Sequence, residues 1–252
     1  MLELDANLPP GALCAATPEP LLAALGPAHW WHGAEPYLDQ DTTTGAVTRW
    51  RTCNDGPAAR PTDPNDGNGQ TGTVDDLYGL QCRPGVHCGV VGENAAPDAA
   101  TATVAIRYYT PPGAEARTLF ALNAEEAGNY LFLSEAEGML TAKDDAGHGE
   151  ATLTCPAEDA PRLAIVSLFG DRLALSLGPA RADAKAATGI LSGAANLYIG
   201  CRNQRPRLLK TLGSALILDV WLFPGRALLH SDAPADIRAR KALQRHHLWA
   251  SA

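Results

Sequence analysis

The sequence is short of positive charge. Its 252 residues include 20 Lys and Arg residues against 28 Asp and Glu residues, which gives a formal net charge of −8 at pH 7. Binding to phosphate groups depends on a basic surface, so this balance argues against nucleic acid and anionic membranes as main partners. A neutral polymer or another protein remains open as a partner.

Long apolar runs and an export signal are also missing. No apolar run approaches the ~20 residues that span a bilayer, so we expect no membrane insertion. The chain opens Met1-Leu-Glu-Leu-Asp5, with acids where a secretion signal carries Lys or Arg. We therefore expect synthesis to end in the cytoplasm, without a signal peptide.

Cysteine is sparse and scattered, at positions 14, 53, 82, 88, 155 and 201. Only Cys82 and Cys88 lie close together, and five intervening residues exceed the usual two-to-four-residue spacing of zinc ligands. In a reducing compartment such thiols act as small buried hydrophobes. We expect no metal site and no cofactor.

What the sequence does contain favours many short strands. The chain has 24 glycines, 19 prolines and 46% hydrophobic residues, enough for a packed core with frequent turns. Alternating or β-branched segments recur every 8–12 residues, which is typical of an all-β sandwich or barrel. Strands are predicted at 46–50, 85–91, 101–109, 117–122, 130–134, 139–142, 151–155, 162–169, 172–177, 196–200 and 214–223. Because 214–223 is almost continuously apolar, it should be covered on both faces or lie centrally in a sheet.

The two ends of the chain differ from this pattern. Residues 1–28 are predicted to form an arm and candidate docking segment, with a short helix at 18–25 that Thr17 could cap. Residues 29–252 are predicted to form the sandwich, with a long loop at 54–73 and a C-terminal helix at about 231–249. Ile237, Leu243 and Leu248 define the face by which that helix should pack.

Five segments carry a resemblance to a known superfamily. They are Thr118-Leu-Phe-Ala-Leu122, Asn129-Tyr-Leu-Phe-Leu133 with Gly138-Met-Leu140, Ile165-Val-Ser-Leu-Phe-Gly-Asp-Arg-Leu-Ala-Leu175, Asn196-Leu-Tyr-Ile-Gly200 and Asp219-Val-Trp-Leu-Phe223. In this order they resemble the concanavalin A-like lectin/glucanase superfamily, especially its laminin-G-like branch. The resemblance covers roughly residues 30–249 and implies a two-sheet β-sandwich (jelly roll). Its motifs specify a fold more than an activity.

The resemblance also suggests a setting. A signal-less, lectin-like chain with an N-terminal arm resembles the spike or fibre proteins of phage-like particles, such as the head spike of gene transfer agents. This implies a place on the exterior of the particle, homo-oligomers, and contacts to capsid or particle proteins through the arm.

Catalytic residues are not evident. Glycosidases of the superfamily carry acids at alternate positions of one strand, so that the side chains share a sheet face. Here Glu135 and Glu137 form the nearest pair, in a predicted hairpin turn where both should be solvated. The 63–69 segment superficially resembles a calcium loop, but its glycine is displaced from the required position, and a solvated turn is the simpler interpretation.

Aromatic and polar residues give candidate ligand contacts. His29-Trp30-Trp31-His32 could be a sugar-stacking platform, although core packing at the sandwich edge is the favoured interpretation. Trp50, Tyr130, Phe132 and Trp221 are predicted to be core. Function concentrates on loops, so the candidate carbohydrate-binding residues are Asp75, Asp76, Tyr78, His87, Arg202, Asn203 and Arg205. The basic 202–210 segment could alternatively contact an anionic polysaccharide or be a solvated loop.

We therefore predict a non-enzymatic protein that recognises cell-surface or capsular polysaccharide. Two alternatives stay open: a structural or oligomerisation module of a spike, and a polysaccharide hydrolase or lyase.

Overall fold

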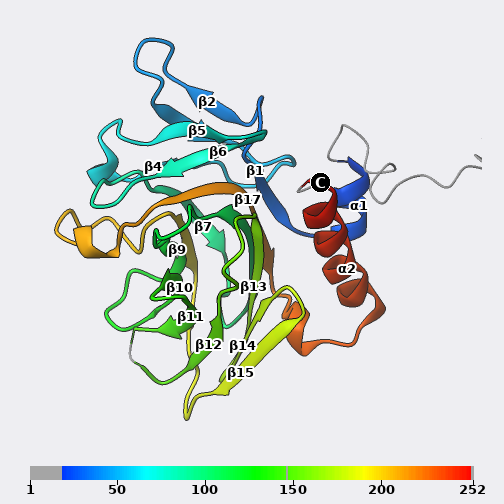
Figure 1. The fold of residues 1–252 in the computed structure, drawn as a ribbon. Coiled ribbons are helices and arrows are strands. Elements are labelled where there is room, and N and C mark those ends of the chain that lie inside the picture. The colour runs from blue at the N-terminus through cyan, green and yellow to red at the C-terminus, as the bar shows by residue number, and fades with distance from the viewer. Residues whose placement is uncertain (1–18, 146, 251–252) are drawn as a thin grey trace, which may run out of the picture.

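Two antiparallel sheets packed face to face make up most of the protein (Figure 1). The computed structural model describes residues 19–145 and 147–250. In this part of the chain, α1 (Glu19–Leu25) and α2 (Pro234–Trp249) are the α-helices. The predicted class, an all-β two-sheet sandwich with a C-terminal helix, is confirmed.

The first sheet is built around the strand predicted to be central. Its order is β15 (Ala180–Lys185), β14 (Arg172–Leu177), β13 (Arg162–Phe169), β8 (Thr101–Tyr109), β17 (Ala215–Pro224), β6 (Leu77–Cys82) and β5 (Gln70–Val74), and β1 (His29–His32) also pairs with β17. Residues 215–223 of β17 are all buried, because the strand lies between neighbours and is covered on both faces.

The second sheet forms the opposite layer. Its order is β12 (Glu150–Thr154), β11 (Met139–Asp144), β10 (Tyr130–Ala136), β9 (Arg117–Asn123), β16 (Ala195–Ile199), β7 (Val90–Ala96), β4 (Ala59–Pro61), β3 (Val47–Trp50) and β2 (Leu38–Gln40). The apolar side chains that alternate along β9, β10 and β16 face the first sheet and form the main core.

The predicted 54–73 loop is wrong in part. It contains β4, a 3-10 turn η1 (Asp63–Asn65) and most of β5. β15, whose sequence is Ala-Arg-Ala-Asp-Ala-Lys, was not predicted because it is an edge strand exposed along most of its length. Such strands owe their conformation to the neighbouring strand more than to their own side chains.

Four of the five tryptophans belong to the core, as predicted. Trp31, Trp50 and Trp221 are completely buried and Trp30 is 3% exposed. β1 therefore closes the sandwich edge and does not form a sugar-stacking platform. The thiols of Cys82, Cys88 and Cys201 are also buried and free, whereas Cys14 lies outside the described residues.

A buried ion pair joins the two sheets. Glu135 on β10 is 5% exposed and accepts hydrogen bonds from Arg162 Nη1 at 2.8 and 3.0 Å and from Tyr108 Oη at 2.6 Å. Both donors lie on the first sheet, on β13 and β8. The expectation that Glu135 is solvated is therefore wrong, since its side chain points into the sandwich; Glu137 is exposed as expected, in the turn that follows.

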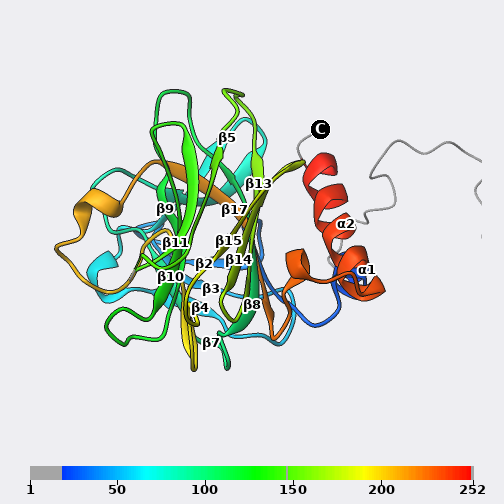
Figure 2. The ribbon, with the colours of Figure 1, turned by 90° about the horizontal axis from the view of Figure 1, so that it is seen from below.

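Both helices cover the outer face of the first sheet (Figure 2). Leu25 of α1 and Ala239 and Leu243 of α2 pack with Trp30 and Trp221 of the sheet. The C-terminal helix begins three residues later than predicted, and Leu248 is 66% exposed and does not face the sheet. Neither described helix is long and apolar enough to cross a membrane.

Candidate functional site

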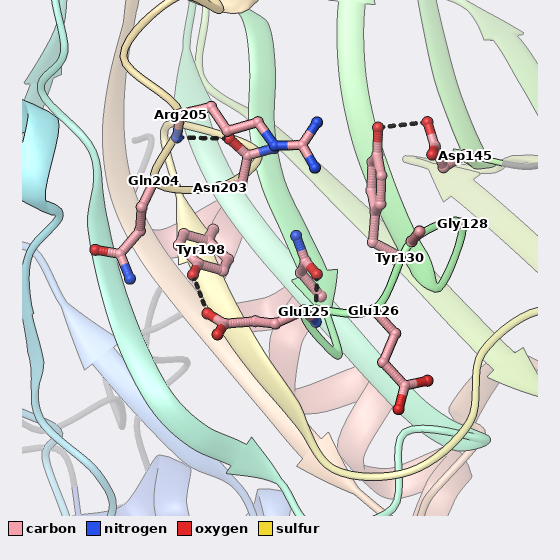
Figure 3. A pocket seen from close by; sticks show the side chains of 11 residues that line it. Glu125, Glu126, Gly128, Tyr130, Asp145, Tyr198, Asn203, Gln204 and Arg205 are labelled. Atoms are coloured by element: carbon pink, nitrogen blue, oxygen red, sulfur yellow. Dashed lines mark hydrogen bonds between the residues drawn. The ribbon is translucent and has the colours of Figure 1, made fainter.

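A pocket of about 590 Å³ opens on the outer face of the second sheet (Figure 3). In Figures 1 and 2 the helices lie on one side of the sandwich, and the segment between β16 and β17, which forms one wall of the pocket, lies on the other. The lining residues are Asn123, Glu125, Glu126, Ala127, Gly128, Tyr130, Asp145, Tyr198, Asn203, Gln204 and Arg205.

Strand register brings the floor of this pocket together. Asn123 of β9 lies directly opposite Tyr130 of β10 and Asn196 of β16, and Tyr198 lies opposite Ala121. Directly paired residues share a sheet face, so the two tyrosines and Asn123 all point outward. The β9–β10 hairpin and β16, a strand distant in sequence, thus supply one polar surface.

The turn after β9 carries the first acidic wall. Glu125 has a φ of +62°, and its backbone N–H donates to Asn123 Oδ1 at 2.6 Å. Its Oε1 accepts hydrogen bonds from Tyr198 Oη at 2.6 Å and Asn196 Nδ2 at 2.8 Å. Burial and the bond to Glu125 raise the pKa of Tyr198. The phenol is therefore a permanent donor, and Glu125 Oε2 is left for other donors.

Tyr130 and Asp145 form the facing wall. Tyr130 Oη donates to Asp145 Oδ1 at 2.5 Å, and burial together with this carboxylate raises the pKa of Tyr130. Behind them, the Arg202 guanidinium carbon lies 3.6 Å from the ring centroid of Phe132, and Arg202 Nε donates to Thr118 Oγ1 at 3.1 Å. Stacking on the ring fixes Arg202 at the base of the loop.

The rim is made by the loop that follows β16. Asn203 Oδ1 accepts a hydrogen bond from Arg205 N at 2.9 Å, and Gln204 Oε1 accepts one from Asp63 N at 3.2 Å. Phenols, amides, carboxylates and a guanidinium therefore surround one cavity. Convergent donors and acceptors beside aromatic rings suit a ligand rich in hydroxyl groups.

The structure separates the predicted binding residues. Asn203 and Arg205 line the pocket, and Arg202 supports it from the stack on Phe132. His87 contacts the same loop through Nε2, 2.8 Å from the carbonyl oxygen of Pro206.

The remaining three predicted residues lie in the hairpin of β5 and β6, in the other sheet. Asp75 and Asp76 form its exposed turn, and Tyr78 Oη accepts a hydrogen bond from Gln40 Nε2 at 2.7 Å. They do not take part in the pocket.

Five polar or ionisable lining residues are not among those that the sequence predicts: Glu125, Glu126, Tyr130, Asp145 and Tyr198. The prediction that Tyr130 is a core residue is wrong, because it is half-buried and faces the pocket. The available signal was the turn chemistry of 125–129 and 144–149 beside an outward tyrosine. Sequence alone does not show that these turns meet.

The 63–69 segment is held by a buried amide. Asn65 is completely buried; its Nδ2 donates to the Gly89 carbonyl at 2.9 Å, and its Oδ1 accepts from Gly69 N at 2.8 Å. Asp63 and Asp66 are exposed. The described part of the chain has no group of three or more His, Cys, Asp or Glu side chains that could hold a metal ion.

Comparison with known proteins adds evidence on the fold. No family model and no curated protein matches the chain. Similar solved structures include the binding domain of Paraclostridial Mosquitocidal Protein 1 (TM-score 0.51, 10% identity, 84% of this chain and 52% of that chain). They also include Trypanosoma rangeli sialidase in complex with 2,3-difluorosialic acid (TM-score 0.49, 13% identity, 88% of this chain and 33% of that chain). Domains LG4-5 of the mouse laminin α1 chain are similar as well (TM-score 0.38, 14% identity, 50% of this chain and 36% of that chain).

These likenesses concern the fold alone, because every identity is far below 25%. The chain spans about half the length of the mosquitocidal binding domain and about a third of the other two chains. The fold and the pocket together define a β-sandwich protein with a polar site on its outer face.

Proposed function

We propose that the protein is a non-enzymatic carbohydrate-binding module that recognises cell-surface or capsular polysaccharide. The observation that carries this proposal is the outer-face pocket, in which Tyr130 and Tyr198 stand beside amide and carboxylate groups. Sugar rings offer hydroxyl groups for such polar side chains and apolar faces for aromatic rings.

The charge of the pocket favours sugars over phosphorylated ligands. Its lining has three carboxylates, those of Glu125, Glu126 and Asp145, and Arg205 is the one cationic residue among the lining residues. Phosphate recognition normally uses several cationic or backbone N–H donors. A fold shared with a protein described as a binding domain is compatible with this role.

The proposed setting is the exterior of a phage-like particle, in homo-oligomers that contact particle proteins through the N-terminal arm. Support for this setting comes from the sequence resemblance. Most of the arm, residues 1–18, lies outside the described residues, and the rest forms α1 and the turn that follows.

The positions of Glu135 and Glu137, the two acids that the sequence offers as catalytic candidates, favour binding without cleavage. Glu135 is held inside the sandwich by Arg162 and Tyr108, and Glu137 is in an exposed turn that does not line the pocket. A buried, ion-paired carboxylate cannot reach a glycosidic bond from the outer face.

The test compares the two groups of predicted residues. Binding to a panel of immobilised capsular and cell-surface polysaccharides would be measured for the wild-type chain, for Asn203→Ala/Arg205→Ala at the pocket, and for Asp75→Ala/Asp76→Ala at the β5–β6 hairpin. We expect the pocket variant to lose about tenfold in affinity, as for two lost polar contacts, and the hairpin variant to bind as wild type.

Absence of binding to every polysaccharide would reject the proposal, and loss in the hairpin variant alone would move the site to the first sheet. Release of reducing ends from a bound polysaccharide would replace the binding function by hydrolysis.

A further inference from the structure

The outward side of α2 combines positive charge with exposed apolar groups. Arg238, Lys241 and Arg245 follow one another at intervals of three and four residues, so they lie on one face of the helix. Trp249, four residues further, continues this face and is 40% exposed, and Leu248 beside it is 66% exposed. Ala239, Leu243 and His246 lie on the opposite, buried face.

This face borders a groove shared with α1. The groove has a volume of about 460 Å³ and is lined by Ala24 of α1 and by Pro234, Ile237, Arg238, Lys241, Ala242 and Arg245 of α2. Ala24, Ile237 and Ala242 are half-buried, whereas the three cationic side chains are exposed. The apolar groups therefore lie at the base of the groove and the charges along its rim. α1 and α2 lie side by side in both ribbon views (Figures 1 and 2).

The rim cations have no ion-pair partner in residues 19–145 and 147–250. The other charged groups of α2 are engaged: Asp236 pairs with Arg226 at 2.7 Å, and Arg240 Nη1 donates to the carbonyl oxygen of Ser231 at 2.9 Å. Three exposed cations on one helix face are unusual in a chain with a net charge of −8. They create a local positive potential on an otherwise acidic molecule.

We propose that this face, Ala24 with residues 234–249, is the docking site for an acidic amphipathic helix of a partner protein. Arg238 and Arg245 are seven residues apart, about 10 Å along the helix axis. Carboxylates at the same spacing on a partner helix can pair with the three cations. Apolar side chains of that helix would enter the groove above Ala24, Ile237 and Ala242, in the manner of helix-in-groove recognition.

The shape and charge of the site favour a protein over a membrane or a nucleic acid. A bilayer surface is flat and cannot reach apolar groups recessed below cationic side chains, and only Leu248 and Trp249 at one end are exposed enough to insert. Long polyanions would meet repulsion from the acidic remainder of the chain. A short acidic helix neutralises the three cations and covers the groove.

The test uses the full chain and a synthetic peptide of about 18 residues, which makes about five helical turns. The peptide carries Glu at positions that match the three cations, with Leu on the adjoining stripe, and a control peptide has Gln for Glu. Affinity would be measured by fluorescence anisotropy at about 20 and about 300 mM NaCl, since salt screens surface charge pairs. Anionic phosphatidylserine vesicles and a peptide of residues 1–16 would be tested in parallel.

Two variants have the same change in charge at different places. Arg238→Glu/Lys241→Glu/Arg245→Glu reverses the docking face, and Arg49→Glu/Arg207→Glu/Lys210→Glu reverses three exposed cations elsewhere. We expect the acidic peptide to bind the wild-type chain and the second variant equally, and the first variant at least about tenfold more weakly. Ile237→Ser, which leaves the charges in place, should also weaken binding if the groove is used.

Four outcomes would overturn the proposal. One is no difference between the Glu and Gln peptides, and another is equal loss in both charge-reversal variants. In the third outcome the wild-type chain binds the vesicles but not the acidic peptide, and the docking-face variant no longer binds the vesicles. The face would then contact a lipid surface. The fourth is strong binding of the 1–16 peptide in place of the acidic peptide, which would assign the face to the chain's own N-terminal segment.

Discussion

His32 Nδ1 lies 2.6 Å from Asp219 Oδ1, beneath the C-terminal helix. Asp219 has no exposed surface, and it also contacts Trp30 Nε1 at 2.9 Å, Arg107 Nη1 at 3.4 Å and His246 Nε2 at 3.4 Å. Burial alone would raise the pKa of Asp219, but His32 and His246 outweigh it and hold that pKa below its ordinary value. One buried charge therefore ties β1, β8, β17 and α2 together.

The first prediction concerns this carboxylate. Asp219→Asn leaves Arg107 and the histidines without their shared negative charge, so we expect a loss of about 3–5 kcal/mol in the free energy of unfolding, the range for breaking a buried ion pair. Urea unfolding at neutral pH measures it. Asp183→Asn, which breaks an exposed pair with Arg181, is the control and should cost no more than about 1 kcal/mol. Equal effects of the two variants would contradict the role of Asp219.

The second prediction is acid sensitivity of the helix contact. Burial, followed by the nearby charges of Arg107 and His246, lowers the pKa of His247 to about 4. The unfolded chain, with an ordinary histidine pKa, binds the proton more readily, so the contribution of His247 falls as pH drops from about 6.5 towards 4. His32 acts oppositely: burial alone lowers its pKa, but Asp219 raises it overall, so its stabilisation is full below about pH 6.5 and is lost as pH rises through the raised pKa.

Urea unfolding at several values between about pH 4 and pH 8 separates these effects. His247→Asn should reduce the loss of stability on the acid side, and His32→Asn should reduce the loss on the basic side. His148→Asn, at an exposed histidine in the turn between β11 and β12, is the matched control. An unchanged acid limb in His247→Asn would show that His247 does not control it.

The third prediction distinguishes structure from activity at Glu135. Glu135→Gln leaves Arg162 partly unpaired between the sheets, so we expect a loss of about 2–4 kcal/mol in the free energy of unfolding. Polysaccharide binding at a temperature where the variant is folded should not change. Glu137→Gln, in the exposed turn, should alter neither property. A selective loss of binding in Glu135→Gln would place this residue in the functional site after all.

The fourth prediction concerns the contact between β6 and β17. A Cβ atom on Gly79 would lie 2.1 Å from the Ile217 carbonyl oxygen and 2.9 Å from its carbon, both backbone atoms of the central strand. Gly79→Ala should therefore cost more than about 2 kcal/mol, because the strands must separate to relieve the overlap. Gly189→Ala meets nothing within 4 Å and should be neutral. Thermal unfolding of the pair measures the difference.

Local patterns predicted the strands of the C-terminal half well, with the exception of β15. β13 and β14 begin and end where expected, because apolar alternation stops at the Gly170-Asp171 turn. β4 and β5 were hidden in a polar stretch containing Pro61 and Gly72. Their strand conformation comes from pairing with β7 and β6, and such pairing is not encoded in the segment itself.

The candidate site could be predicted only where one loop supplied several groups. Asn203 and Arg205 lie two residues apart in a polar turn and were recognised together. Glu125 and Tyr198 are 73 positions apart and meet through the register of β9 and β16. The apolar sequence of β10 predicts a core position for Tyr130. Its side chain, however, points away from the first sheet.

The place of β17 has a consequence for how the protein is made. Among the described strands it is the last in the chain, yet it pairs with β8 on one side and with β6 and β1 on the other. Until the ribosome has released residues 215–224, the first sheet exists only as separate pieces with unpaired edges. Such edges are prone to aggregation. A chain that stops short of β17 should therefore fail to fold, and nascent chains should depend on protection by chaperones until this strand inserts.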